Sequence, residues 1–182
     1  MEGTRSTPRE ITYLAPQQVN QLEEACLIPE DKLLVRLLYQ TGARISEVLA
    51  LKPRNIDYAQ QRLELPALKR KDISTKLVIV DSNTLDRLRS YCRGKPADKP
   101  LFSICRQQAY YRVRIAAKRA GLGKVHPHVL RDSLAVNWAL SGGNLNLLQR
   151  QLGHRSFSTT VNRYLTFSSE DVRKEYNRVM VT

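Results

Sequence analysis

The chain has 182 residues, and its 30 lysines and arginines outnumber its 17 aspartates and glutamates, which gives a formal net charge of +13. This length suffices for one domain with a hydrophobic core, and the charge, with a pI of about 10.0, is typical of nucleic-acid binders, although it also fits a surface kept basic for solubility. The three isolated cysteines exclude a disulfide framework, and no apolar run approaches the roughly 18 residues of a membrane span, so we expect a cytoplasmic protein.

The first third of the chain is expected to be helical after a polar start. Residues 1–11 predict a flexible segment or linker. Apolar residues at helical spacing predict three helices, over residues 16–27, 30–41 and 44–51. Pro29 is expected to break the first helix, and Gly42 is expected to end the second.

Arg44 follows a turn of small residues in the segment TGARISEVLAL and stands at the start of the third predicted helix. Helix amino termini present unpaired N–H groups that can bind anions. The position therefore indicates an anion site, with an ordinary surface arginine as the alternative.

Residues 62–80, RLELPALKRKDISTKLVIV, predict two strands, 62–65 and 77–80, joined by a basic turn. The turn is expected to carry four cations: Lys69, Arg70, Lys71 and Lys76. A solvated charged hairpin is one interpretation, and a lysine presented at the tip of a flexible finger is the other.

A second basic element follows a helix that Asp81 or Ser82 is expected to cap and that ends near Cys92. Residues 105–120 predict a helix in which tyrosines lie among cations. Such a helix fits a DNA groove and its phosphates, with a solvated basic face as the alternative. Together with Arg70 and Lys71 of the hairpin, the candidate DNA-binding residues are Arg106, Arg112, Arg114 and Lys118.

Residues 126–165 hold the most suggestive set of side chains. His128 and Arg131 are three residues apart, which places them on one face of a helix. His154 and Tyr164 follow. A guanidinium can fork onto phosphate oxygens, a phenol can act as a nucleophile, and imidazoles can move protons near neutral pH. These groups suit chemistry on a phosphodiester without a metal ion.

These pieces together resemble the catalytic domain of tyrosine recombinases, the phage integrase and Xer-type family. The matching motifs are TGARISEVLAL, LKRKDISTKLVIV, HPHVLRDSLA and LGHRSFSTTVNRYL, in the family's order. The resemblance implies a mainly helical α+β fold with a small antiparallel sheet, spanning residues 12–182. It also implies site-specific cleavage and rejoining of double-stranded DNA, with no cofactor and no metal.

The resemblance further implies roles for individual residues. Arg44 and Arg131 would clamp the scissile phosphate, and Tyr164 would attack the phosphorus to form a 3′-phosphotyrosyl link. Lys69 would protonate the leaving 5′ oxygen. His128 and His154 would assist the tyrosine or hold the phosphate by hydrogen bonds. Glu47 matches an acidic position of the family that supports the site.

Three features depart from the family's pattern. Asp132 follows Arg131 where many members have histidine, so it receives no role. Tyr164 comes ten residues after His154, whereas nine is usual. Both Lys69 and Lys71 fit the general acid, because they share one side of a strand; the distance from Arg44 favours Lys69, and the distance back from the second strand favours Lys71.

The ends of the chain bear on assembly. The chain begins about where the catalytic domain begins, so no N-terminal core-binding domain is expected in it. Residues 168–182 predict a last helix with an apolar stripe. It could dock on a neighbouring subunit of a tetramer on DNA, or equally on its own domain. Two rival functions stay open: type IB topoisomerase-like relaxation, and DNA binding without catalysis.

Overall fold

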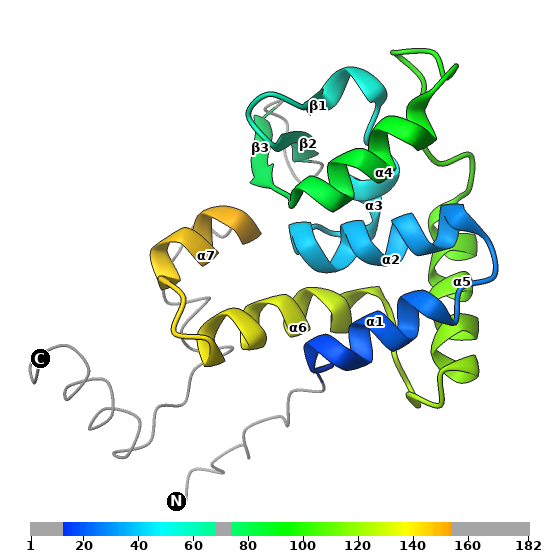
Figure 1. Cartoon of the computed structure of the whole chain (residues 1–182), viewed down its shortest axis with the longest axis vertical. Coiled ribbons are helices and arrows are strands. Elements are labelled where there is room, and N and C mark those ends of the chain that lie inside the picture. Colours follow the sequence, from blue (N-terminus) through cyan, green and yellow to red (C-terminus); the bar gives the residue numbers. More distant parts are fainter. Residues whose placement is uncertain (1–12, 68–73, 154–182) are drawn as a thin grey trace, which may run out of the picture.

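The computed structural model describes residues 13–67 and 74–153 (Figure 1). The domain is mainly helical, with one small sheet at its edge (Figure 1), so the expected mainly helical α+β fold is confirmed. The elements are α1 Pro16–Glu24, α2 Pro29–Thr41, α3 Ile45–Leu49, the 3₁₀ helix η1 Pro53–Asn55, β1 Ile56–Asp57, β2 Arg62–Ala67, β3 Ser74–Ile79, α4 Ser82–Cys92, α5 Arg106–Arg119, α6 Pro127–Leu140 and α7 Leu145–Leu152.

Helix α2 forms the centre of the domain. It lies between α4 on one side and α1 and α6 on the other (Figure 1). Its leucines are buried on several faces, which is the pattern of a helix enclosed by its neighbours. Leu34, Leu37 and Leu38 are fully buried. Helix α2 is therefore enclosed by its neighbours, and its carboxyl end supplies part of the candidate site.

The helix boundaries agree with the sequence predictions within a few residues, with one correction. Pro29 does not simply break the first helix; it is the first residue of α2, where its missing N–H costs nothing. Asp81 caps α4 as expected, because its carboxylate accepts a hydrogen bond from the Thr84 N–H at 2.6 Å. The predicted last helix, residues 168–182, lies outside the described residues.

The three strands form one antiparallel sheet in the order β1-β2-β3. Strand β2 continues beyond its predicted end at residue 65, β3 begins before its predicted start at residue 77 and ends one residue before its predicted end at residue 80, and β1 was not predicted. In the pairing of β2 with β3, Leu63 lies opposite Val78 and Leu65 lies opposite Lys76. Opposed residues share a face of a sheet, and this face is the buried one. Lys76 therefore points inward, which corrects its placement in the exposed turn.

Helix α7 is held against the free edge of β3 by one glutamine. The Gln151 side chain accepts from the Ile79 N–H at 3.0 Å and donates to the Ile79 carbonyl at 2.8 Å. It also donates to the Gln40 carbonyl at 2.9 Å, near the end of α2. Edge strands leave such groups unpaired, so Gln151 both covers the edge and brings α2, β3 and α7 together.

Candidate active site

A tight turn after α2 forms the base of the site. Gly42 ends the helix with a φ of 55°, the left-handed conformation that glycine adopts without cost. A Cβ atom at this position would lie 2.5 Å from a methyl carbon of Leu152 and 2.9 Å from one of Leu134. The turn therefore needs glycine for its backbone conformation and for the close approach of α6 and α7.

Arg44 stands at the amino end of α3, as predicted. Its guanidinium lies 2.8 Å from the carboxylate of Glu47, which is buried. The same carboxylate accepts a hydrogen bond from the Arg44 backbone N–H at 2.9 Å. The Arg44 side chain is 43% exposed. The buried Glu47 carboxylate thus holds both the backbone and the side chain of Arg44 in place, while the Arg44 guanidinium remains accessible to an anion.

Arg131 projects from α6 and is almost completely buried, with 2% of its surface exposed. Its guanidinium donates to the carbonyl of Gly42 and, at 3.0 Å, to the carbonyl of Leu152. These carbonyls belong to the carboxyl ends of α2 and α7, where a cation is favoured. Arg131 therefore joins the turn that precedes Arg44 to the turn that precedes His154.

His128 lies one turn before Arg131 on α6, and its side chain is half exposed. The Nε2 atom lies 3.9 Å from a carboxylate oxygen of Asp132, which is mostly buried. This pair attracts only when the imidazole is protonated. Asp132 received no role from the sequence, although its spacing of four residues from His128 would have indicated the contact.

Lys76 enters the same region from β3 and was not predicted there. Its Nζ atom lies 3.5 Å from the carbonyl oxygen of Thr41, the last residue of α2. The pKa of Lys76 is lowered to about 7, mainly because burial disfavours the charged form and then because of the positive charge of Arg131; Glu47 raises this pKa, and Arg44 lowers it. The inward face of β3 thus adds a third cation to the two arginines.

The remaining predicted site residues, Lys69, His154 and Tyr164, lie outside the described residues, as do Arg70 and Lys71 of the hairpin. Gly153 is the last described residue before His154. It ends α7 with a φ of 66°, next to the Leu152 carbonyl that Arg131 contacts. The structure therefore brings together Arg44, Arg131 and the residue that precedes His154.

Helix α5 carries the predicted DNA-binding residues of the second half of the chain. Arg106, Arg114 and Lys118 are exposed and lie at intervals of four or eight residues, on one face. Arg112 lies on another side. It forms ion pairs with Glu30 at 2.7 Å and Asp31 at 3.0 Å. This arginine ties α5 to the first turn of α2 in the present structure.

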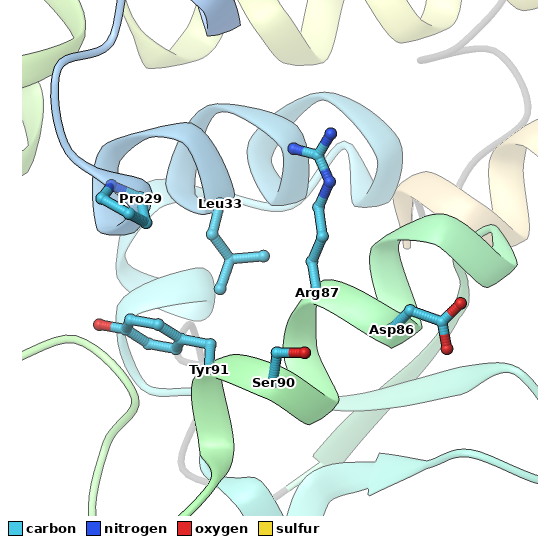
Figure 2. Close-up of a pocket in the computed structure, with 6 residues that line it drawn as sticks. All are labelled: Pro29, Leu33, Asp86, Arg87, Ser90 and Tyr91. Carbon is cyan, nitrogen blue, oxygen red and sulfur yellow. The ribbon is translucent and has the colours of Figure 1, made fainter.

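A separate hollow lies between α2 and α4 (Figure 2). Figure 2 shows Leu33 and Tyr91 on either side of it, with Arg87 rising from α4. Arg87 pairs with Glu23 of α1, so its charge is engaged within the fold. Arg44, His128 and Arg131, the candidate catalytic residues that the structure describes, do not line this hollow; its lining residues are Pro29, Leu33, Asp86, Arg87, Ser90 and Tyr91.

Two further features of the described residues bear on the class of site. Within residues 13–67 and 74–153, no three histidine, cysteine or acidic side chains come close enough to hold a metal ion together. In that same part of the chain, no helix has the length and apolar character needed to cross a bilayer. The charged groups that these residues bring together at the candidate site are Arg44, Arg131 and Lys76 with the buried carboxylate of Glu47, and the His128–Asp132 pair.

The chain that carries Arg44, Arg131 and the Gly42 turn is related in sequence to a known protein family. The chain belongs to the phage integrase family, whose sequence profile matches residues 12–170. It is 30% identical over 172 residues to tyrosine recombinase XerA of Saccharolobus solfataricus, covering 94% of this chain and 58% of that protein. It is 31% identical over 177 residues to tyrosine recombinase XerC of Roseiflexus sp., covering 86% of this chain and 55% of that protein.

Solved structures show the same fold. A crystal structure of XerA recombinase superposes with a TM-score of 0.78 at 26% identity, covering 96% of this chain and 67% of that one. The catalytic domain of bacteriophage HP1 integrase gives a TM-score of 0.70 at 22% identity, covering 95% of this chain and 99% of that one. The chain spans about half the length of the curated relatives it matches.

Proposed function

We propose that this chain is the catalytic domain of a site-specific recombinase that cleaves and rejoins double-stranded DNA through a 3′-phosphotyrosyl intermediate. The observation that carries the proposal is the convergence of Arg44 and Arg131 on the Gly42 turn, directly beside the residue that precedes His154. Family members with related folds include XerH bound to its difH substrate and the Tn1549 transposon integrase bound to transposon DNA.

The proposed reaction uses side chains alone. The Tyr164 hydroxyl gives its proton to His128 and attacks the phosphorus, while the bond from phosphorus to the 5′ oxygen breaks. Arg44 and Arg131 neutralise the charge that grows on the non-bridging oxygens. Lys69 gives its proton to the leaving 5′ oxygen. The phosphotyrosyl ester keeps the energy of the broken bond, so a 5′ hydroxyl of the same or another strand reverses the step.

The partner in this proposal is double-stranded DNA, approached from the basic face of α5. Arg106, Arg114 and Lys118 are exposed there, and their contacts would go mainly to phosphates. Arg112, by contrast, is engaged with two acids, so we expect it to contribute less to DNA affinity. We place the reaction in the cytoplasm, together with its DNA.

A covalent selection tests the proposed function. A pool of short duplexes with a randomised centre and a nick near it is incubated with the chain, so that cleavage releases a short strand and traps the protein on DNA. We expect protein–DNA adducts that survive denaturation, and sequencing of the trapped DNA should reveal a preferred site. Binding without any adduct would favour a DNA-binding module that lacks catalysis.

The topoisomerase alternative is distinguished by products. A recombinase should convert two trapped sites on one plasmid into exchanged or deleted circles, whereas a type IB topoisomerase needs no second site and yields only relaxed circles. Relaxation at full rate on a plasmid that lacks the selected sequence would favour the topoisomerase.

The general acid can be identified by the leaving group. We expect Lys69→Ala to cleave ordinary DNA slowly, because no group protonates the 5′ oxygen. A substrate with sulfur at the 5′-bridging position should restore its rate, since a thiolate leaves without a proton. The measurement is single-turnover cleavage of both substrates, with Lys71→Ala as the matched variant. Rescue of Lys71→Ala and none of Lys69→Ala would assign the acid to Lys71.

Assembly is proposed to depend on the last segment. Recombination requires four coordinated active sites, and we propose that the tail helix of residues 168–182 docks on a neighbouring subunit in a tetramer on DNA. Deleting residues after Leu165 should then impair recombination and the two-site complex more than binding to one site. Gel-shift and size-exclusion measurements with one and two DNA sites provide the comparison. Unchanged recombination would place the coupling elsewhere.

A further inference from the structure

Strand β3 inserts a lysine between the carboxyl ends of two helices. The Lys76 ammonium lies 3.5 Å from the Thr41 carbonyl at the end of α2. Its methylene chain covers Gly153 at the end of α7, where an added Cβ would lie 2.8 Å from Cδ and 3.3 Å from Cε of the lysine. Arg131 bridges the same two helix ends through the neighbouring carbonyls of Gly42 and Leu152. The two cations are therefore held side by side.

In a sheet with one buried face, apolar side chains usually point inward and charged ones outward. Lys76 and its neighbours in β3 show the opposite arrangement. Along β3, Leu77 and Ile79 are exposed, at 51% and 58%, while Lys76 shares the inward face with Val78. A one-residue change of register would expose the lysine and bury both apolar residues. The fold instead keeps a cation inside at the expense of two exposed apolar side chains.

The surroundings of Lys76 make its charge costly. Arg131 faces it from α6 and Arg44 from α3, and the opposing carboxylate is Glu47. Helix carboxyl ends favour a cation, but the hydrogen bond to Thr41 is long and cannot offset burial by itself. The pKa of about 7 records this imbalance. An oxyanion bound by the two arginines would remove the repulsion and restore the lysine's positive charge.

We propose that Lys76 is a third cation of the phosphate site, contacting a non-bridging oxygen of the scissile phosphate beside Arg44 and Arg131. It is separate from the proton donor assigned to the hairpin turn, and it also fixes the Gly153 turn that precedes His154. This inference rests on the proposed function, because that function supplies the phosphodiester.

Stability and cleavage should move in opposite directions when the charge is removed. Lys76→Met keeps a stem that can cover Gly153 but carries no charge. We expect it to cleave a trapped duplex about tenfold to a hundredfold more slowly and to unfold at a higher urea concentration than the unsubstituted chain. Lys99→Met is the matched control, since Lys99 is an exposed lysine in the loop after α4. If Lys76 served only to tie the helices together, Lys76→Met would instead unfold at a lower urea concentration than the unsubstituted chain.

The gain in stability should also depend on pH in a definite direction. The folded chain holds the Lys76 proton with a pKa of about 7, whereas the ordinary pKa of a lysine is 10.5. The unfolded chain therefore binds more protons between these values, and the penalty that Lys76 imposes is full below pH 7 and fades as pH rises to 10.5. The stability difference between Lys76→Met and the unsubstituted chain should shrink over the same range.

A measurement without catalysis tests the anion contact directly. In a chain labelled with ¹³C at lysine Cε, the Lys76 signal is identified by its loss in Lys76→Arg and titrated with and without sulfate, a tetrahedral oxyanion, against chloride at equal ionic strength. We expect a midpoint near 7 that rises with sulfate by at least about half a unit, while Lys99 is unchanged.

The outcomes separate the inference from the proposed function. Equal cleavage by Lys76→Met and Lys99→Met, loss of stability in Lys76→Met, or a Lys76 midpoint that sulfate leaves unmoved would each overturn the role of Lys76. Absence of covalent adducts with the unsubstituted chain would instead count against the recombinase, and the sulfate titration would then decide whether Lys76 belongs to an anion site.

Discussion

Replacing Tyr164 by phenylalanine should abolish covalent attachment to DNA and leave DNA affinity nearly unchanged. The phenol oxygen is the proposed nucleophile, and phenylalanine lacks it while keeping the aromatic ring. Among the six proposed catalytic residues, Arg44, Lys69, His128, Arg131, His154 and Tyr164, the tyrosine is the one with a hydroxyl that can form an ester with phosphorus. We therefore expect no detectable adduct on a denaturing gel with a trapping duplex, and a dissociation constant within about twofold by gel shift.

Tyr176→Phe is the matched control, because Tyr176 is the other tyrosine that follows LGH and stands in the predicted last helix. It should form the adduct at the normal rate if Tyr164 is the nucleophile. An adduct that persists in Tyr164→Phe and vanishes in Tyr176→Phe would transfer the role, and would also explain why Tyr164 lies ten residues after His154 rather than nine.

The sequence predicted the helices and the arginine positions because local chemistry determines both. Gly42 is needed where a helix ends with positive φ, so the turn before Arg44 could be placed before the structure was known. The spacing of His128 and Arg131 puts them on one face of α6 by helix geometry alone. For these residues, the local pattern and the tertiary structure agree.

The position of Lys76 could not be predicted in the same way. Its segment is apolar on both faces from Leu77 onward, so alternation of side chains did not determine which face would be buried. The register is decided by pairing with β2 and by Gln151, which binds the backbone of Ile79 from a helix 72 residues away. The contact of Arg131 with the Leu152 carbonyl is likewise a product of packing between α6 and α7.

Removing the guanidinium of Arg44 should reduce cleavage by about a hundredfold to a thousandfold, because charge on the phosphate oxygens would develop without a preorganised donor. The Arg44 side chain is 43% exposed, and the buried Glu47 carboxylate keeps its hydrogen bond from the backbone N–H of residue 44 when the guanidinium is removed, so Arg44→Ala should lose less stability than Arg131→Ala. Arg44→Lys should recover only a small part of the rate, since an ammonium cannot form the planar fork of a guanidinium.

Arg131→Ala should lose cleavage to a similar extent and also stability. Its guanidinium is buried and satisfies the carbonyls of Gly42 and Leu152, so removal should cost about 2–4 kcal/mol in the free energy of unfolding. Urea unfolding measured beside single-turnover cleavage separates the two effects. Arg54→Ala is the control, because Arg54 is an exposed arginine paired with Asp98 in a loop.

Comparing Arg44→Ala with Arg131→Ala separates loss of a phosphate contact from displacement of the turns that hold the site. Loss of cleavage in Arg131→Ala could follow from displacement of the Gly42 and Gly153 turns, whereas Arg44→Ala disturbs neither. If Arg44→Ala cleaves as fast as Arg54→Ala, then Arg44 does not contact the phosphate, and Arg131 acts by holding the turns. If Arg44→Ala is slow at full stability, the two guanidinium groups form the clamp, with Glu47 and the helix ends holding them in place.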